Sequence, residues 1–134
     1  MKNTLLIFVL TFAFFAFTSD SSVPKGDQFR VDYNHVAIYN KETKKWSDWI
    51  RADHTFVFNY NLRNDVMHMK ANGDNFVYKK MTEVEDGKND IGQEYQAFSA
   101  LDEEGLRFTL LLYHDKKVGL MMIYSDVKIQ FTYF

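Results

Sequence analysis

The residues of this chain best suited to acid–base or metal chemistry are its four histidines, His35, His54, His68 and His114. An imidazole titrates near neutral pH and is also a common metal ligand. These histidines fall on separate predicted strands or strand ends, and no H-E-x-x-H or H-x-H spacing connects them. We therefore predict no metal site and no cofactor.

Carboxylates offer a second route to catalysis. Asp48 and Asp53 flank one predicted strand and Glu94 begins another, so carboxylates could meet at one end of a barrel for acid–base work. The chain has no cysteine and no G-x-S-x-G elbow, which excludes thiol catalysis and gives no support to a serine nucleophile. A small hydrolase or other enzyme using Asp, Glu or His is thus the alternative to a non-catalytic function.

Aromatic and methionine side chains are candidates for ligand binding. Trp46 and Trp49 lie on one predicted strand at a spacing that sends one ring into the interior and the other outside. Methionines can line an adaptable pocket, although packing in the core explains them equally well. The predicted ligand-binding set is Trp46, Trp49, Met67, Met69, Tyr78 and Tyr95.

The amino terminus has the pattern of a secretory signal peptide. Lys2 precedes a continuous apolar segment from Leu5 to Phe17, which at about 1.5 Å rise per residue reaches only about 20 Å of the roughly 30 Å that a bilayer core requires. We expect residues 1–19 to be removed, with cleavage between Ala16 and Ser22. The mature protein is then exported to a periplasm or the medium and has no membrane span.

The remaining segment, residues 20–134, has the size of one domain. It contains 115 residues, and without Lys2 its 15 basic and 18 acidic residues give a charge of −3. This balance provides no field to attract nucleic acid. Since the chain has no cysteine for disulfides, stability must come from the sheet and from core packing. Aromatic residues, which make up 17% of the full sequence including the leader, recur through this domain and can contribute to that core. We expect a monomer.

Apolar and polar residues alternate along most of this domain with the period of two that is typical of β-strands. A bulge is predicted near Asn34, and the polar segment 81–93 is predicted to be the longest loop. The predicted strands cover residues 29–39, 45–51, 54–61, 65–71, 74–80, 94–101, 106–113, 118–124 and 127–133.

Two hairpins have turns specific enough to predict a register. Asn72-Gly73 is the preferred dipeptide of a two-residue type I′ turn, which places Met69 opposite Phe76 and Met67 opposite Tyr78 on one face. The segment 102–105 predicts a four-residue connection that places Leu101 opposite Leu106.

Eight or nine short strands joined by hairpin-length turns predict an all-β fold, a single antiparallel meander that closes into a barrel, with a β-sandwich as the alternative. In architecture this resembles the lipocalin-like barrels, although the glycine-x-tryptophan signature near the first strand is missing. We expect a binding or interaction module whose partner is an apolar small molecule or an envelope protein.

Overall fold

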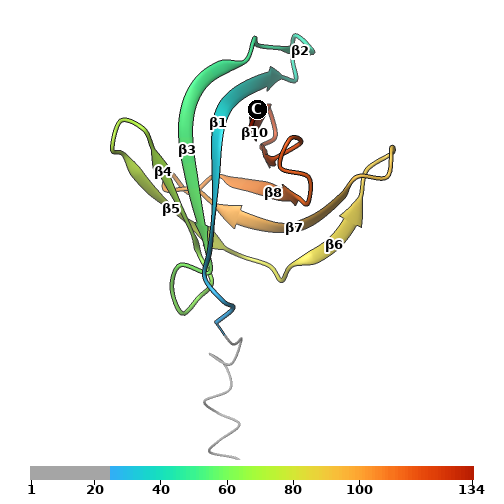
Figure 1. Cartoon of the computed structure of the whole chain (residues 1–134). Helices are drawn as coiled ribbons and strands as arrows, with labels where there is room; N and C mark the ends of the chain where they lie inside the picture. The colour runs from blue at the N-terminus through green and yellow to red at the C-terminus, as the bar shows by residue number, and fades with distance from the viewer. Residues whose placement is uncertain (1–24) are drawn as a thin grey trace, which may run out of the picture.

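The computed structural model describes residues 25–134, and the predicted signal peptide, residues 1–19, lies outside the described residues. The described part is all β, with ten strands and no helix (Figure 1). No helix in it therefore has the length and hydrophobicity needed to cross a bilayer. The strands are β1 (Phe29–Asn40), β2 (Lys45–Trp46), β3 (Ile50–Phe58), β4 (Val66–Lys70), β5 (Asn75–Lys80), β6 (Glu85–Lys88), β7 (Glu94–Leu101), β8 (Arg107–Tyr113), β9 (Leu120–Ile123) and β10 (Val127–Thr132).

Eight of the strands form a closed antiparallel barrel. The order β1-β3-β4-β5-β7-β8-β9-β10 is closed by pairing of β10 with β1, from His35 opposite Thr132 to Asn40 opposite Val127. Figure 1 shows these first and last strands side by side. The other two strands lie outside this closed set: β2 pairs with the end of β1, and β6 pairs with the first half of β7. The predicted lipocalin-like barrel is confirmed, and the closure excludes the sandwich.

Alternating side chains fill the barrel. Phe56 on β3, Phe108 and Leu110 on β8 and Leu120 on β9 are at most 1% exposed and form the centre of the core. The predicted bulge near Asn34 is confirmed by a register shift between Tyr33 and His35 in the β1–β3 ladder.

The predicted two-residue turn between β4 and β5 is wrong. Lys70 N donates to the carbonyl of Asp74 at 2.9 Å, so the loop between these paired residues contains three residues, 71–73. Gly73 has a φ of +95°, whereas Asn72 does not have the positive φ that a type I′ turn requires. The observed loop, residues 71–73, ends in a left-handed glycine and adds one residue to the connection.

This extra residue shifts the β4–β5 register by one and exchanges the faces of β4. Met67 lies opposite Val77, and His68 lies opposite Phe76. His68 is 3% exposed and faces the interior, while Met67 and Met69 lie on the outer face. The prediction that Met67 and Phe76 share a face is therefore wrong.

The β7–β8 hairpin also departs from its prediction, but its connection is one residue shorter than predicted. Asp102 N donates to the carbonyl of Leu106 at 2.9 Å, and Gly105 has a φ of +85°. Leu101 consequently lies opposite Arg107, not opposite Leu106. The outer face of β7 carries Tyr95 and Ser99.

Other local features also differ from the sequence prediction. The predicted strand over residues 45–51 is interrupted after Trp46, and β3 already begins at Ile50. β6 lies within the segment predicted as a loop, because its backbone pairs with β7. Thr132, which alternates with the core residue Phe131 and the partly buried Ile129 along β10, is only 1% exposed, and it donates its hydroxyl hydrogen to the carbonyl of Lys117.

Candidate functional site

A cavity of about 450 Å³ occupies one end of the barrel, within the size range of about 300 to 1,000 Å³ of small-molecule pockets. One wall comes from β1, β9 and β10 and is entirely apolar: Val36, Ile38, Met122, Ile129 and Phe131. The opposite wall comes from β3, β4 and β5 and carries polar groups among aromatic rings: His54, His68, Lys70, Phe76 and Tyr78. The remaining lining residues are Asp102, Glu103, Glu104 and Tyr124.

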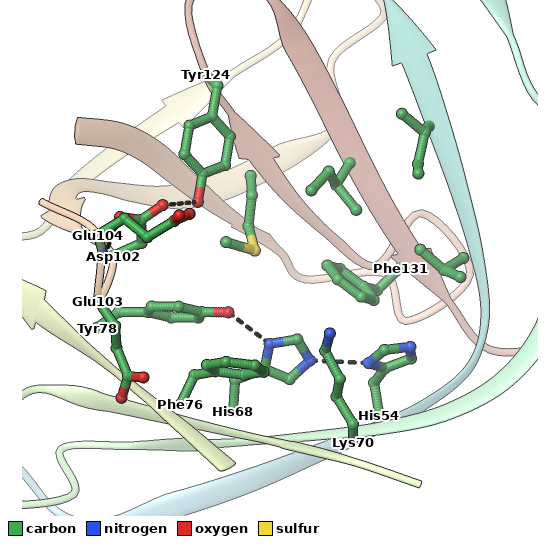
Figure 2. A pocket seen from close by; sticks show the side chains of 14 residues that line it. His54, His68, Lys70, Phe76, Tyr78, Asp102, Glu103, Glu104, Tyr124 and Phe131 are labelled. Carbon is green, nitrogen blue, oxygen red and sulfur yellow. Dashed lines mark hydrogen bonds between the residues drawn. The ribbon is translucent and has the colours of Figure 1, made fainter. Parts of the chain in front are cut away.

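Three polar side chains on neighbouring strands form a hydrogen-bonded chain along the cavity (Figure 2). Tyr78 Oη lies 2.7 Å from His68 Nδ1, and His68 Nε2 lies 2.8 Å from His54 Nδ1. The strand registers bring them together. His68 lies opposite Phe76, which is two residues from Tyr78 on the same face of β5. His54 lies opposite Lys70, which is two residues from His68 on the same face of β4. The His68 ring also stacks on Phe56, with centroids 4.2 Å apart.

Burial favours the neutral forms of all three side chains in this hydrogen-bonded chain. Desolvation lowers the pKa of His68 to about 3, with smaller contributions from His54 and Lys70. Desolvation and then the charge of Lys70 lower the pKa of His54, while burial raises the pKa of Tyr78. In a neutral chain the protons can run from Tyr78 toward His54 or in the opposite direction, so His54 Nε2 can present either a donor or an acceptor to the cavity.

Two of the three carboxylates at the cavity are used by the fold. Asp102 Oδ2 accepts a hydrogen bond from the Tyr124 hydroxyl at 3.0 Å, and its other oxygen accepts from the backbone nitrogens of Glu104 and Leu106. Glu103 Oε2 accepts a hydrogen bond from the backbone nitrogen of Val77 at 3.0 Å. These carboxylates hold the β7–β8 turn in place beside β5.

The hydrogen bond from Val77 to Glu103 lies beside the short β5–β7 pairing, in which only Lys79 and Lys80 of β5 pair with β7. Replacing Glu103 by alanine is expected to lower the free energy of unfolding by about 1 kcal/mol, because Val77 loses its acceptor. It is also expected to speed hydrogen exchange of the Val77 amide. Glu103→Gln keeps an acceptor oxygen and is expected to retain most of the stability.

Urea unfolding and amide exchange by NMR measure both effects. The matched control is Glu104→Ala, since the Glu104 side chain has no hydrogen bond or ion pair within residues 25–134. Equal losses for the two alanine variants would contradict the role assigned to Glu103.

Of the six residues predicted to bind a ligand, Tyr78 lines the cavity. Trp46 lies against Tyr39 and Trp49 lies against Phe134, and each is 44% exposed. Neither ring enters the interior, so the prediction that one of them does is wrong. The register shifts described above place Met67, Met69 and Tyr95 on the outer face.

The polar groups that line the cavity were not among the predicted binding residues. His54 could have been recognised, because it precedes Phe56 and Phe58 on the inner face of one strand. His68 required the correct hairpin register. The carboxylates considered for catalysis, Asp48, Asp53 and Glu94, are not among the residues that line the cavity. The carboxylates that do line it are Asp102, Glu103 and Glu104. Within residues 25–134, no three His, Asp or Glu side chains converge as a metal ion would require.

Together, the fold and the cavity define a small lipocalin-like barrel with a ligand-sized space at one end. Comparison of the chain with family models, with curated proteins and with solved structures finds no match in any of the three. The function must therefore be argued from the cavity itself.

Proposed function

We propose that the protein is an exported, non-catalytic binding module that holds a small, mainly apolar ligand in the barrel cavity. The observation that carries this proposal is the cavity volume of about 450 Å³. An eight-stranded barrel is just wide enough for its side chains to fill it or for it to hold one small ligand. Because this barrel keeps a large space at one end, it fits the second case.

The lining supports the same conclusion. A wall made of Val36, Ile38, Met122, Ile129 and Phe131 offers only apolar surface. Contact with such a wall removes ligand surface from water, which is favourable by about 25 cal/mol per Å² of apolar area. The hydrogen-bonded side chains of Tyr78, His68 and His54 supply the few polar groups that typically orient a ligand in such a pocket. Export of the protein rests on the predicted signal peptide alone.

A second candidate is an enzyme that works by acid–base chemistry. It is favoured by one observation, that the imidazoles of His54 and His68 line the same cavity as the carboxylates of Asp102 and Glu104. Groups of these types can transfer protons to and from a bound substrate. A binding module releases its ligand unchanged, whereas an enzyme converts it, so the chemical fate of the bound molecule separates the two candidates.

Binding is tested with the protein of residues 20–134 and the neutral fluorescent probe N-phenyl-1-naphthylamine. We expect saturable binding of one probe per protein. Ile129→Trp places a large ring in the cavity and is expected to weaken binding by at least about tenfold, since this corresponds to the loss of only about 60 Å² of apolar contact. Fluorescence titration gives the dissociation constants, and thermal unfolding shows that the variant folds.

The matched control is Met121→Trp, on the outer face of the adjacent strand. Absence of saturable binding to the folded wild-type protein would overturn the proposal, as would equal weakening by both tryptophan variants. Native mass spectrometry of protein purified from its source identifies a retained molecule. Conversion of that molecule during incubation with the protein would favour the enzyme.

A further inference from the structure

Lys70 places a positive charge at the cavity without a negative partner. Its Nζ lies 4.8 Å from the centre of the Phe76 ring, which attracts a cation through the face of the ring. Within the described part of the chain the Lys70 ammonium makes no ion pair and no hydrogen bond. A cation held beside an apolar cavity in this way is available to an anionic group of a ligand.

Next to Lys70, His54 offers a second group. The two residues are direct partners in the β3–β4 ladder and both face the cavity, as Figure 2 shows. His54 Nδ1 is engaged by His68, which leaves Nε2 for the ligand. When the Tyr78 hydroxyl donates to His68 and His68 donates to His54, Nε2 carries the hydrogen and can donate it.

The carboxylates, in contrast, offer less to a ligand. Asp102 accepts hydrogen bonds from Tyr124 and from two backbone nitrogens, and Glu103 accepts one from the backbone nitrogen of Val77. Figure 2 shows them near the Tyr78 end of the hydrogen-bonded chain, whereas Lys70 lies near the His54 end. The third carboxylate, that of Glu104, makes no hydrogen bond or ion pair with any other described residue, but Figure 2 shows it beside Asp102, away from Lys70. At the His54 end the free polar groups are thus a cation and an imidazole, and the wall that faces them is apolar.

We propose that the ligand is an apolar monocarboxylic acid, such as a fatty acid, whose carboxylate lies between the Lys70 ammonium and His54 Nε2 and whose hydrocarbon part covers Val36, Ile129 and Phe131. This inference rests on the proposed function and adds the chemical class and orientation of the ligand. Charge-assisted hydrogen bonds to a carboxylate are roughly twice as strong as neutral ones, so the charge is expected to determine selectivity.

Displacement of the neutral probe by decanoate, decanol and decylamine tests the inference. We expect decanoate to bind most tightly, and octanoate to dodecanoate to gain about fourfold in affinity per added methylene. Lys70→Met is expected to weaken decanoate binding by about tenfold to a hundredfold while decanol binding stays unchanged. The matched control Lys79→Met removes an exposed lysine from the neighbouring strand and is expected to leave both affinities unchanged.

Lys70→Gln provides a second variant if the methionine variant does not fold. Equal affinities of decanoate and decanol, or equal weakening of both by Lys70→Met, would overturn the inference and leave the proposed function standing. Tighter binding of decylamine would also overturn it, because the carboxylates would then select the ligand. If the neutral probe and all three competitors fail to bind, the proposed function fails as well.

Discussion

Gly119→Ala is expected to lower the free energy of unfolding by at least about 4 kcal/mol, a large part of the 5–15 kcal/mol that typically stabilises a domain. Gly119 lies between β8 and β9 and has a φ of +87°. A Cβ atom there would lie 1.8 Å from the carbonyl oxygen of Phe131 and 3.1 Å from Thr132 Cα. Both contacts are with the backbone of β10, the strand that closes the barrel against β1, so the clash cannot be relieved by turning a side chain.

Gly73→Ala is the matched control for this prediction. Gly73 has a φ of +95°, but a Cβ atom there meets nothing within 4 Å. The control therefore isolates the cost of left-handed backbone, about 1–2 kcal/mol for a residue with a side chain. Urea unfolding of both variants measures the difference. Similar losses at the two positions would show that β10 moves aside easily and that the closure is loosely held.

The type of fold could be predicted because its signal is local. Alternation of apolar and polar residues along 54–58 and 127–131 depends only on which side chains face the core, and a period of two identifies a strand wherever it pairs. The positions of the turns followed from glycine and from short polar segments. The number of hairpin-linked strands favoured a closed barrel but left the sandwich open, and only the pairing of β10 with β1 decides between them.

Register could not be predicted in the same way. Asn72-Gly73 suits a two-residue turn, and the observed three-residue loop uses the same glycine in a left-handed conformation. The predicted register buries the two apolar side chains of Met67 and Met69, whereas the observed register buries Val66 and the polar His68, so the hydrophobicity of β4 alone favours the wrong register. Contacts far away in the sequence decide between them. Phe131 of β10, for example, packs edge-on against the His68 ring at 5.4 Å.

The candidate site could not be predicted for the same reason, because the positions of its polar groups depend on the β3–β4 and β4–β5 registers. A slip of one residue in the β4–β5 hairpin would turn His68 outward and break both hydrogen bonds that connect Tyr78 with His54. Lys70 would turn outward with it. The proposed carboxylate site therefore depends on the three-residue loop 71–73 and the register that it sets, and its chemistry cannot be inferred from the spacing of the histidines alone.

The folded protein is expected to lose about 2.5 kcal/mol of stability between pH 7 and pH 4.5 through His68 alone. Burial lowers the pKa of His68 from its ordinary value of 6.5 to about 3. Above pH 6.5 the imidazole is neutral in both states and has no effect. Between 6.5 and about 3 the unfolded chain binds a proton that the folded protein does not bind, so stability falls by about 1.36 kcal/mol per pH unit.

Urea unfolding from pH 7 to pH 4.5 measures this slope. Carboxylates also destabilise the fold in acid, so the test compares the wild-type protein with the double variant His68→Phe/Tyr78→Phe, which removes the imidazole without leaving the hydroxyl unsatisfied. The variant is expected to have the shallower pH dependence, whatever its stability at pH 7. His114→Phe, which changes an exposed histidine outside the barrel interior, is the matched control. Parallel curves for the wild-type protein and the double variant would mean that His68 takes up its proton inside the folded barrel, and the neutral hydrogen-bonded chain on which the ligand site depends would then be wrong.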